Sequence, residues 1–235
     1  MLEVAVYSGC TLALTNVALK SYVWRNPASR LAADMDDGCN RQVHHYVVPI
    51  LTMMLGLALL SLEFVLEGVW TEWHRIDGDS WWFGVRRQWA TSWALGLGAG
   101  HYVQDMITNK WCGTVLFAHH VAAVAHAFAL QAASSWGNML FCWSGVYEAG
   151  SLLLNLGYTG AISRKSGHYA QTVSSIVGIC FGIHGIIVQW PRLCELNAAA
   201  WFSVLMLFLL GIGRIQDGVE NLIALRASES RAKTA

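Results

Sequence analysis

The sequence predicts an all-α protein, a polytopic transmembrane helical bundle of about seven spans. Of its 235 residues, 55% are hydrophobic and only 13% are charged, whereas a soluble domain carries about 25% charged residues. The apolar residues are gathered into long runs, and a helix needs roughly 20 such residues to cross about 30 Å of hydrocarbon. The runs also lack the alternation of apolar and polar residues that a transmembrane β-barrel requires.

The first candidate span covers residues 3–22 and is the weakest, because Thr11, Thr15 and Asn16 interrupt it. The N-terminal stretch MLEVAVYSGC contains an acid and no Lys or Arg, so we expect a retained span rather than a cleaved signal peptide. The six further candidates are 43–66, 88–108, 113–133, 138–158, 169–190 and 197–213.

The last run leads directly into Arg214, Asp217 and Glu220, which we expect to belong to a helical extension in the cytosol. We therefore divide the chain into a first span with its loop (1–39), a transmembrane domain (40–215) and a polar cytosolic tail (216–235). The end of the tail, RASESRAKTA, is polar throughout. Such a segment lacks the apolar surface that folding requires, so we expect it to be disordered.

The basic residues predict the orientation. With seven spans, 11 of the 15 Lys and Arg residues, Arg214 among them, fall on the side of the C-terminus. Cytosolic loops carry an excess of Lys and Arg, so the C-terminus is expected in the cytosol. We expect a multi-pass protein of the endoplasmic reticulum or another endomembrane, with the plasma membrane as the alternative. The formal net charge of +0 indicates no nucleic-acid partner.

Two further patterns concern packing. The pairs Gly96-x-x-x-Gly100 and Gly178-x-x-x-Gly182 offer small faces on which another helix can pack closely. The six cysteines show no C-x-x-C or zinc-type spacing, so we expect neither a metal site nor a disulfide framework. Those inside apolar runs are expected to be small buried side chains, and they are Cys10, Cys142 and Cys180.

Ionisable residues inside the apolar runs are the candidate functional residues. His119 and His120 lie in TVLFAHHVAAVAHAFAL, Glu148 lies in the next run, and Asp105 ends the run before it. Charged side chains at membrane depth are costly, and they usually mark a functional site. With the orientation above, these residues occupy the cytosolic half of three consecutive, antiparallel spans. They are therefore expected to converge.

Helical spacing refines this cluster. His101 and Asp105 are four residues apart and share a face, whereas His119 and His120 point about 100° apart. A carboxylate facing an imidazole in a dry site suits general acid–base or nucleophilic chemistry. Alternatively, the same groups form an ion pair and hydrogen bonds that hold the bundle together.

Three other chemistries were tested on spacing. A membrane di-iron enzyme needs HxxxH and HxxHH boxes, which the chain lacks. Haem held by two histidines needs one on each of two facing helices, and the available pairs are His101 with His126 and His45 with His184. A retinal protein needs a Lys inside a span, and Lys20 is the only candidate. No motif supports any of these, so no cofactor is expected.

Four stretches in order resemble the TLC-domain membrane proteins, which include ceramide synthases. They are CNRQVHHYVVPIL with Asn40, Arg41 and His45, GAGHYVQDMI with Asp105, LFAHHVAAV with the paired histidines, and YEAGSLLLNLGY with Glu148 and Asn155. The resemblance covers about 40–215. The synthase signature departs at Gly145, where the family has Asp, and at Ser144, where it has His. The resemblance therefore implies the shorter TLC branch, which is implicated in membrane lipid composition, lipid sensing and trafficking.

The resemblance implies handling of lipid acyl chains, with membrane lipids as partners and acyl-CoA as a co-substrate if the protein is an enzyme. His119 or His120 would act as general base or transient acyl acceptor, Asp105 would orient the imidazole, and Glu148 would assist. Four residues would contact substrate, with Arg41 at the phosphate groups: Arg41, His45, His101 and Asn155. The alternative is a non-catalytic lipid sensor or trafficking regulator. The oligomeric state is left open.

Overall fold

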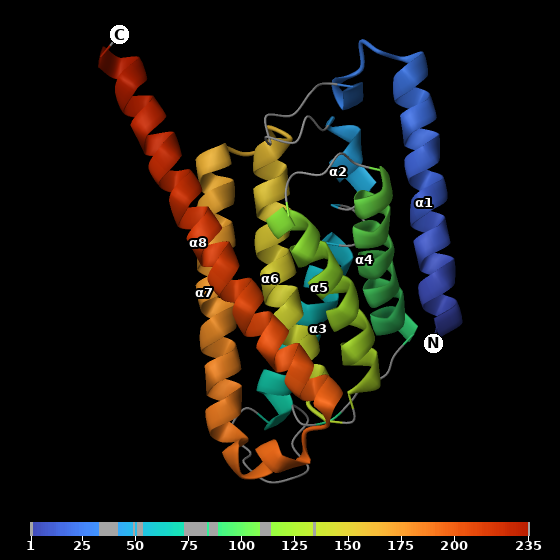
Figure 1. Ribbon diagram of the computed structural model, residues 1–235, viewed down its shortest axis with the longest axis vertical. Helices are drawn as coiled ribbons and strands as arrows, with labels where there is room; N and C mark the ends of the chain where they lie inside the picture. The colour runs from blue at the N-terminus through green and yellow to red at the C-terminus, as the bar shows by residue number, and fades with distance from the viewer. Residues whose placement is uncertain are drawn as a thin grey trace.

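The computed structural model describes residues 2–32, 42–48, 50, 54–72, 84, 89–108, 114–133 and 135–234, and the regular secondary structure of these residues is helical. The all-α prediction is therefore confirmed. The helices run roughly parallel to one long axis of the molecule (Figure 1). In chain order they are α1 (Leu2–Arg25), η1 (Arg30–Ala32), α2 (His44–Val48), α3 (Leu55–Glu72), α4 (Trp89–Thr108), α5 (Thr114–Ala132), α6 (Gly137–Tyr158), α7 (Arg164–Val188), η4 (Trp190–Glu195) and α8 (Ala198–Thr234).

Most of the predicted runs coincide with a helix to within a few residues. The run 43–66 is the exception in the first half, since it is shared between α2 and α3. The helix α7 begins at Arg164, five residues before the predicted start at 169. Ser163 explains this early start, because its side chain accepts a hydrogen bond from Ser166 N at 3.0 Å and so caps the helix.

The predicted helical extension after residue 213 is present, but the prediction of disorder for RASESRAKTA is wrong. Helix α8 continues to Thr234, and its C-terminal end projects beyond the rest of the bundle (Figure 1). Its polar side chains bond to one another along the helix, as Gln216 does to Glu220 at 2.9 Å. Lys165 of α7 also forms a salt bridge of 3.1 Å with Glu229. Ala, Leu, Arg, Glu and Lys are good helix formers, and their propensity outweighs the low hydrophobicity of this segment.

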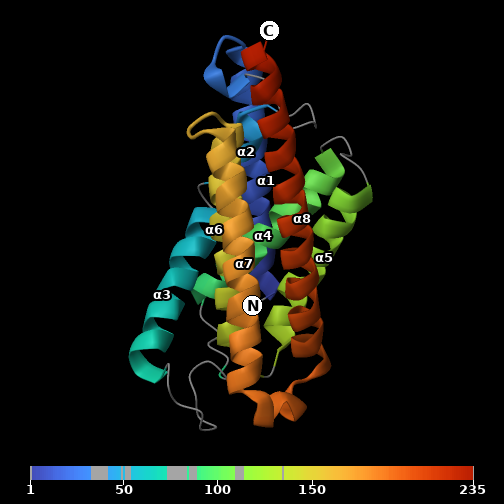
Figure 2. The ribbon, with the colours of Figure 1, turned by 90° about the vertical axis from the view of Figure 1, so that its left-hand side faces the viewer.

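Helix α6 lies at the centre of the bundle. It packs most extensively on α7 and α3, while α8 packs on α7 and α5, and α1 packs on α4. Figure 1 shows α7 at one edge and α1 at the other, with α8 crossing the front of the bundle, and Figure 2 shows α3 lying apart from α8. Helices α5 and α6 make few contacts with each other, although they are consecutive.

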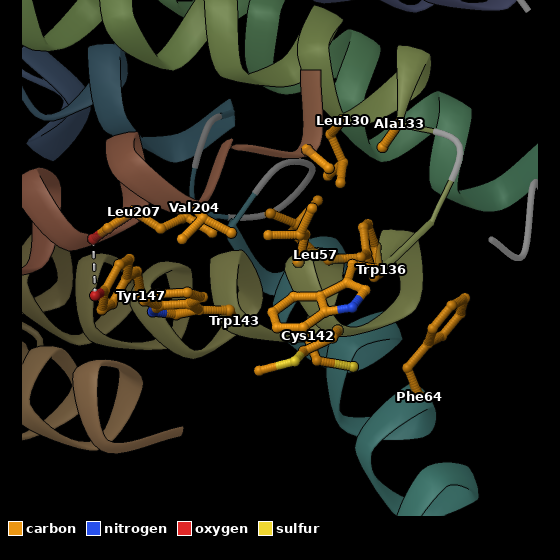
Figure 3. Packing of buried hydrophobic residues seen from close by; sticks show 14 of the residues in the cluster. Leu57, Phe64, Leu130, Ala133, Trp136, Cys142, Trp143, Tyr147, Val204 and Leu207 are labelled. Atoms are coloured by element: carbon orange, nitrogen blue, oxygen red, sulfur yellow. Dashed lines mark hydrogen bonds between the residues drawn. The ribbon is translucent and has the colours of Figure 1, made fainter. Parts of the chain in front are cut away.

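The aromatic residues of α6 form the core between these helices (Figure 3). Trp143 and Tyr147 are at most 1% exposed. The Trp143 ring packs edge-on against Phe208 of α8, with centroids 4.7 Å apart. The Tyr147 hydroxyl donates a hydrogen bond of 3.0 Å to Leu207 O, also in α8. These contacts fix α8 against the central helix.

Glycines make room for the two rings. A Cβ atom on Gly178 would lie 2.3 Å from the Tyr147 ring, and one on Gly182 would lie 2.2 Å from the Trp143 ring. The predicted small face of α7 therefore packs closely, but its partners are aromatic side chains rather than backbone. A close approach of two backbones does occur where Gly100 of α4 meets Gly9 of α1.

The cysteine prediction holds for one residue of three. Cys142 is buried, whereas Cys10 and Cys180 are exposed. The latter two lie on outward-facing sides of α1 and α7, which an apolar run does not distinguish from the inward-facing side. The four described cysteines are free thiols, and they include Cys194.

Two helices within the described residues are long and apolar enough to cross a membrane. They are α7, over Arg164–Val188, and α8, over Ala198–Arg231. In the most apolar stretch of each helix, one third of the residues are buried inside the protein. The chain is therefore an all-helical protein with helices compatible with a membrane, and the seven-span arrangement belongs to the proposals below.

We predict that Gly182→Ala destabilises the protein by about 1–3 kcal/mol, because the new methyl group overpacks the rigid, buried Trp143 ring. Gly213→Ala is the matched control, since a Cβ atom there meets nothing within 4 Å. Thermal unfolding of the detergent-solubilised variants measures the difference. Equal melting temperatures for the two variants would contradict the proposed contact.

Candidate functional site

A cavity of about 70 Å³ lies among α3, α4, α5, α6 and α8. One buried water needs roughly 10–15 Å³, so the space exceeds what a single water requires. Small side chains of α4 and α5 create the space, and leucines of α3, α4 and α8 close it. The small residues are Ala94, Gly98, Ala99, Ala122, Ala123 and Ala127, and the leucines are Leu57, Leu95, Leu207 and Leu210.

The paired histidines divide between two environments. His119 lines the cavity, whereas His120 does not and is 7% exposed. This difference follows from the turn of about 100° between consecutive helical residues. Both rings contact Tyr102 of α4, with centroid separations of 5.8 Å for His119 and 5.1 Å for His120. Tyr102 therefore holds both imidazoles in place, and only His119 faces the cavity.

Glu148 of α6 lines the same cavity. Its Oε1 atom accepts a long hydrogen bond of 3.4 Å from the Tyr102 hydroxyl. Its Oε2 atom is buried and has no hydrogen-bond partner among the described residues. A buried polar atom without a partner is costly, so this oxygen suits a ligand that donates a hydrogen bond. His119 and Glu148 of this wall were predicted from the sequence, whereas Tyr102 was not.

A second polar pair lines the cavity further along α5 and α6. His126 Nε2 lies 2.8 Å from Ser144 Oγ. The Ser144 hydroxyl also donates to Leu140 O at 2.9 Å, which leaves its oxygen free to accept from the imidazole. His126 Nδ1 is buried and unpaired within the described part of the chain. Ser144 therefore serves here as a partner of His126, at a position where the synthase pattern has a histidine.

Arg214 lies inside the protein, whereas its place after the last apolar run predicts a position on the cytosolic side. It was counted with the cytosolic charges, yet it is only 8% exposed and lies between α6, α7 and α8. Its Nε donates to Ser175 Oγ at 3.2 Å, its Nη1 to Ser151 Oγ at 2.8 Å and its Nη2 to Tyr147 O at 2.9 Å. Its guanidinium also lies 5.6 Å from the centre of the Tyr147 ring. The guanidinium interacts electrostatically with Glu148 and with His119.

The burial of Arg214 fits the helical spacing of α8. The buried positions of α8 recur at helical spacing, and the same stripe continues through the arginine. Apolar composition alone ended the predicted span at residue 213, whereas periodicity carries the buried face four residues beyond Arg214. The stripe consists of Ala200, Ser203, Val204, Leu207, Gly211, Arg214 and Gly218.

The other predicted substrate-binding residues do not line the cavity. Asn155 is buried and its Nδ2 lies 3.0 Å from Met54 Sδ. His45 accepts a hydrogen bond of 3.1 Å from Gln42 N and packs on His44. His101 packs on Tyr102, with centroids 5.5 Å apart. Asn155 thus holds the segment before α3, and His45 holds the start of α2. Both residues have partners inside the protein.

Two predicted residues fall on parts of the chain about which the structure gives no side-chain description. Arg41 lies outside the described residues, and Asp105 belongs to α4 but its side chain lies outside them as well. The roles expected of them in binding phosphate and orienting an imidazole therefore remain predictions. Among the described side chains, no group of three His, Cys, Asp or Glu could hold a metal ion.

Comparison with protein-family models, with curated proteins and with solved structures finds no match to this chain. The resemblance to TLC-domain proteins therefore rests on the four sequence stretches alone. The site has to be interpreted from its own geometry.

We predict that Ser175→Ala lowers the free energy of unfolding by about 1–3 kcal/mol, because it leaves a buried donor of Arg214 without its partner. Ser174→Ala is the matched control. Ser174 bonds Gln171 O at 3.0 Å, as Ser175 does at 2.7 Å, but no hydrogen bond joins it to Arg214. Chemical denaturation in detergent compares the two, and a control at least as damaging as Ser175→Ala would refute the assignment.

Proposed function

We propose that the protein handles the acyl chains of membrane lipids and that a short part of such a lipid enters the cavity of about 70 Å³ among α3, α4, α5, α6 and α8. The observation that carries this proposal is the composition of the cavity wall. Most of the lining is alanine, glycine and leucine, and the residues with polar groups are Tyr102, His119, Tyr147, Glu148 and the His126–Ser144 pair. Ligand pockets typically combine such an apolar lining with a few polar groups that orient the ligand.

The outer surface of the bundle supports a place in the membrane. Large apolar side chains are exposed on outward faces of α3, α7 and α8, where water would make their exposure unfavourable. A lipid environment removes this penalty, and α7 and α8 have the length to span it. The exposed residues include Leu59, Leu62, Leu66, Val173, Ile176, Val177, Ile183, Leu205, Leu209 and Ile212.

We propose seven spans with the C-terminus in the cytosol, in the endoplasmic reticulum or another endomembrane. In Figure 1 the chain begins in the lower half and ends at the top, which suits an odd number of crossings. Because Arg214 is buried, it no longer counts among the cytosolic charges. Ten of the remaining 14 Lys and Arg residues still lie on the proposed cytosolic side, so the orientation is unchanged.

In the enzymatic form of this proposal, the reaction is acyl transfer from acyl-CoA to a lipid hydroxyl or amine. His119 takes the proton of the acceptor as its oxygen or nitrogen attacks the thioester carbonyl. The carbon–sulfur bond then breaks, and the proton passes to the departing thiolate. Glu148 accepts a hydrogen bond from the acceptor, and His120 positions Tyr102 from outside the cavity. In this scheme Asp105 supports the imidazole and Arg41 meets the phosphates.

A non-catalytic lipid sensor or trafficking regulator is the second candidate. The contacts that favour it are those that join helices. Tyr102 links α4 to α5 and α6, and Arg214 links α6 to α7 and α8. A lipid in the cavity would then shift how these helices pack, without any covalent step. Both candidates require the cavity, and only acyl transfer requires His119 as a base.

We predict that His119→Ala lowers acyl-CoA turnover by about 100-fold or more, as expected for loss of a general base. His120→Ala should have a smaller effect, because His120 does not line the cavity. His184→Ala, on the exposed side of α7, is the control. The measurement follows free CoA release and intact mass for a covalent acyl group. Lipid bound by a wild type that turns over no acyl-CoA would favour the sensor.

We predict that Ala123→Phe removes most of the lipid that co-purifies with the protein, because the ring fills the cavity that Ala123 lines. Ala118→Phe, at an exposed position of the same helix, should leave the bound lipid unchanged. Mass spectrometry of lipid extracted from both variants gives the comparison. Unaltered lipid in Ala123→Phe would place the binding site elsewhere.

A further inference from the structure

We infer that His126 and Ser144 form a subsite for an uncharged hydroxyl group of the bound lipid. Both residues line the cavity, His126 from α5 and Ser144 from α6. The Nε2 atom of His126 lies 2.8 Å from Ser144 Oγ, whereas its Nδ1 atom is buried and has no partner among the described residues. A group that enters the cavity can supply the missing hydrogen bond. The inference rests on the proposed function in one respect, since it takes the ligand of the cavity to be a lipid.

Ser144 determines which nitrogen of the imidazole carries the proton. A hydroxyl group has one proton to donate and two lone pairs that accept. The Ser144 hydroxyl donates its proton to Leu140 O at 2.9 Å, one turn earlier in α6. The Nε2 atom of His126 must then carry a proton and donate it to the serine oxygen. In a neutral ring this leaves Nδ1 as the nitrogen with a free lone pair, which can only accept a hydrogen bond.

The opposite arrangement is less favourable. If the Ser144 hydroxyl donated to Nε2, the proton of the neutral ring would lie on Nδ1. A buried N–H group without an acceptor would then remain, and such groups are rarer in proteins than unpaired acceptors. The contact of 2.9 Å between Ser144 Oγ and Leu140 O would also lose its proton. The hydrogen bonds therefore favour an imidazole that accepts at Nδ1.

The surroundings of His126 keep the imidazole uncharged. Ala122 and Ala123 lie one turn before it on the same side of α5 and line the cavity with it. Among the described residues no carboxylate forms a salt bridge with His126, although Glu148 lies one turn beyond Ser144 on α6. A buried cation without such a partner is costly, so the neutral ring is favoured.

A neutral imidazole that can only accept selects among the groups of a lipid. A hydroxyl group donates a hydrogen bond to it and brings no charge into the apolar cavity. An ester carbonyl, a carboxylate and a phosphodiester have no proton to donate. An ammonium group would bring a charge, for which the carboxyl group of Glu148 is the better partner. The subsite therefore favours an alcohol over an ester, an acid or an amine.

The subsite is separate from the groups proposed for acyl transfer. On α5, His126 follows His119 by seven residues, which is about 10 Å along the helix axis. On α6, Ser144 precedes Glu148 by four residues, which is about 6 Å. The two polar parts of the cavity can therefore contact different groups of one ligand. His126 selects the ligand, and His119 is the residue that would take a proton.

Binding of a small alcohol to the full-length protein in detergent tests the inference. The probes are 1-butanol and 1-chlorobutane, which are similar in size, but only the alcohol donates a hydrogen bond. Equilibrium dialysis against a detergent blank gives the affinity for each probe. We expect His126→Gln to lower the ratio of alcohol affinity to chloride affinity by about tenfold, as loss of one hydrogen bond does. The glutamine amide can still donate to Ser144, but it has no group in place of Nδ1. His184→Gln, at an exposed position of α7, should leave the ratio unchanged.

Nitrogen-15 NMR of the histidine-labelled wild type gives a second readout. His126→Gln identifies the signals of His126, and Ser144→Ala identifies them if that variant does not fold, because it removes the partner of Nε2. We expect the proton on Nε2 in the absence of a probe. 1-Butanol should shift the Nδ1 resonance to lower frequency, as acceptance of a hydrogen bond does, and 1-chlorobutane should not.

The outcomes separate the subsite from the proposed function. A probe ratio that is unchanged in His126→Gln, a proton on Nδ1, or an Nδ1 signal that 1-butanol does not shift would overturn the inference. A preference for the alcohol that depends on His126, in a protein without bound lipid or acyl-CoA turnover, would reject lipid handling and leave the subsite intact. Bound lipid in a wild type with the same probe ratio as His126→Gln would reject the subsite alone.

Discussion

The hydrogen bonds of one buried guanidinium tie together the three helices on which the rest of the structure depends. Arg214 of α8 reaches Tyr147 and Ser151 of α6 and Ser175 of α7, and each nitrogen has an acceptor. A buried ion without such partners would destabilise the fold by several kcal/mol, so the three acceptors are conditions for this packing. Tyr147 takes part twice, because its hydroxyl also bonds Leu207 O of α8. Tyr147 therefore links the aromatic core to the buried arginine.

The helices could be predicted from the sequence because their apolar runs are long and uninterrupted. Predicted ends were accurate where charge or polarity changes abruptly, as at the start of α4 at Trp89 and the end of α6 at Tyr158. They were wrong where local hydrogen bonds, rather than hydropathy, determine where a helix begins or ends. A serine cap sets the start of α7, and side-chain pairs along α8 extend that helix through a segment that composition alone assigns to disorder. Hydropathy does not register either force.

The candidate site was predictable in part for a related reason. His119 and Glu148 stand out because ionisable groups are rare in apolar runs, and the structure places both on one cavity wall. Arg214 was overlooked because it follows the last apolar run, where an arginine usually marks the membrane surface. Only the spacing of the buried residues of α8 reveals that it faces inward. Its hydrogen-bond acceptors lie on α6 and α7, and the spacing of residues along α8 cannot predict them.

Helix α8 closes the cavity and also carries the buried arginine. Helices α5 and α6 carry the polar groups of the cavity, yet they contact each other little, and α8 packs against both. Leu207 and Leu210 of α8 close the gap that α5 and α6 leave, and Arg214 lies four residues beyond Leu210. A movement of α8 would therefore change the volume of the cavity and the distance from Arg214 to Glu148 together. A lipid that fills the cavity would thus act on the contacts of Arg214 through one helix, whether the protein transfers an acyl chain or only detects it.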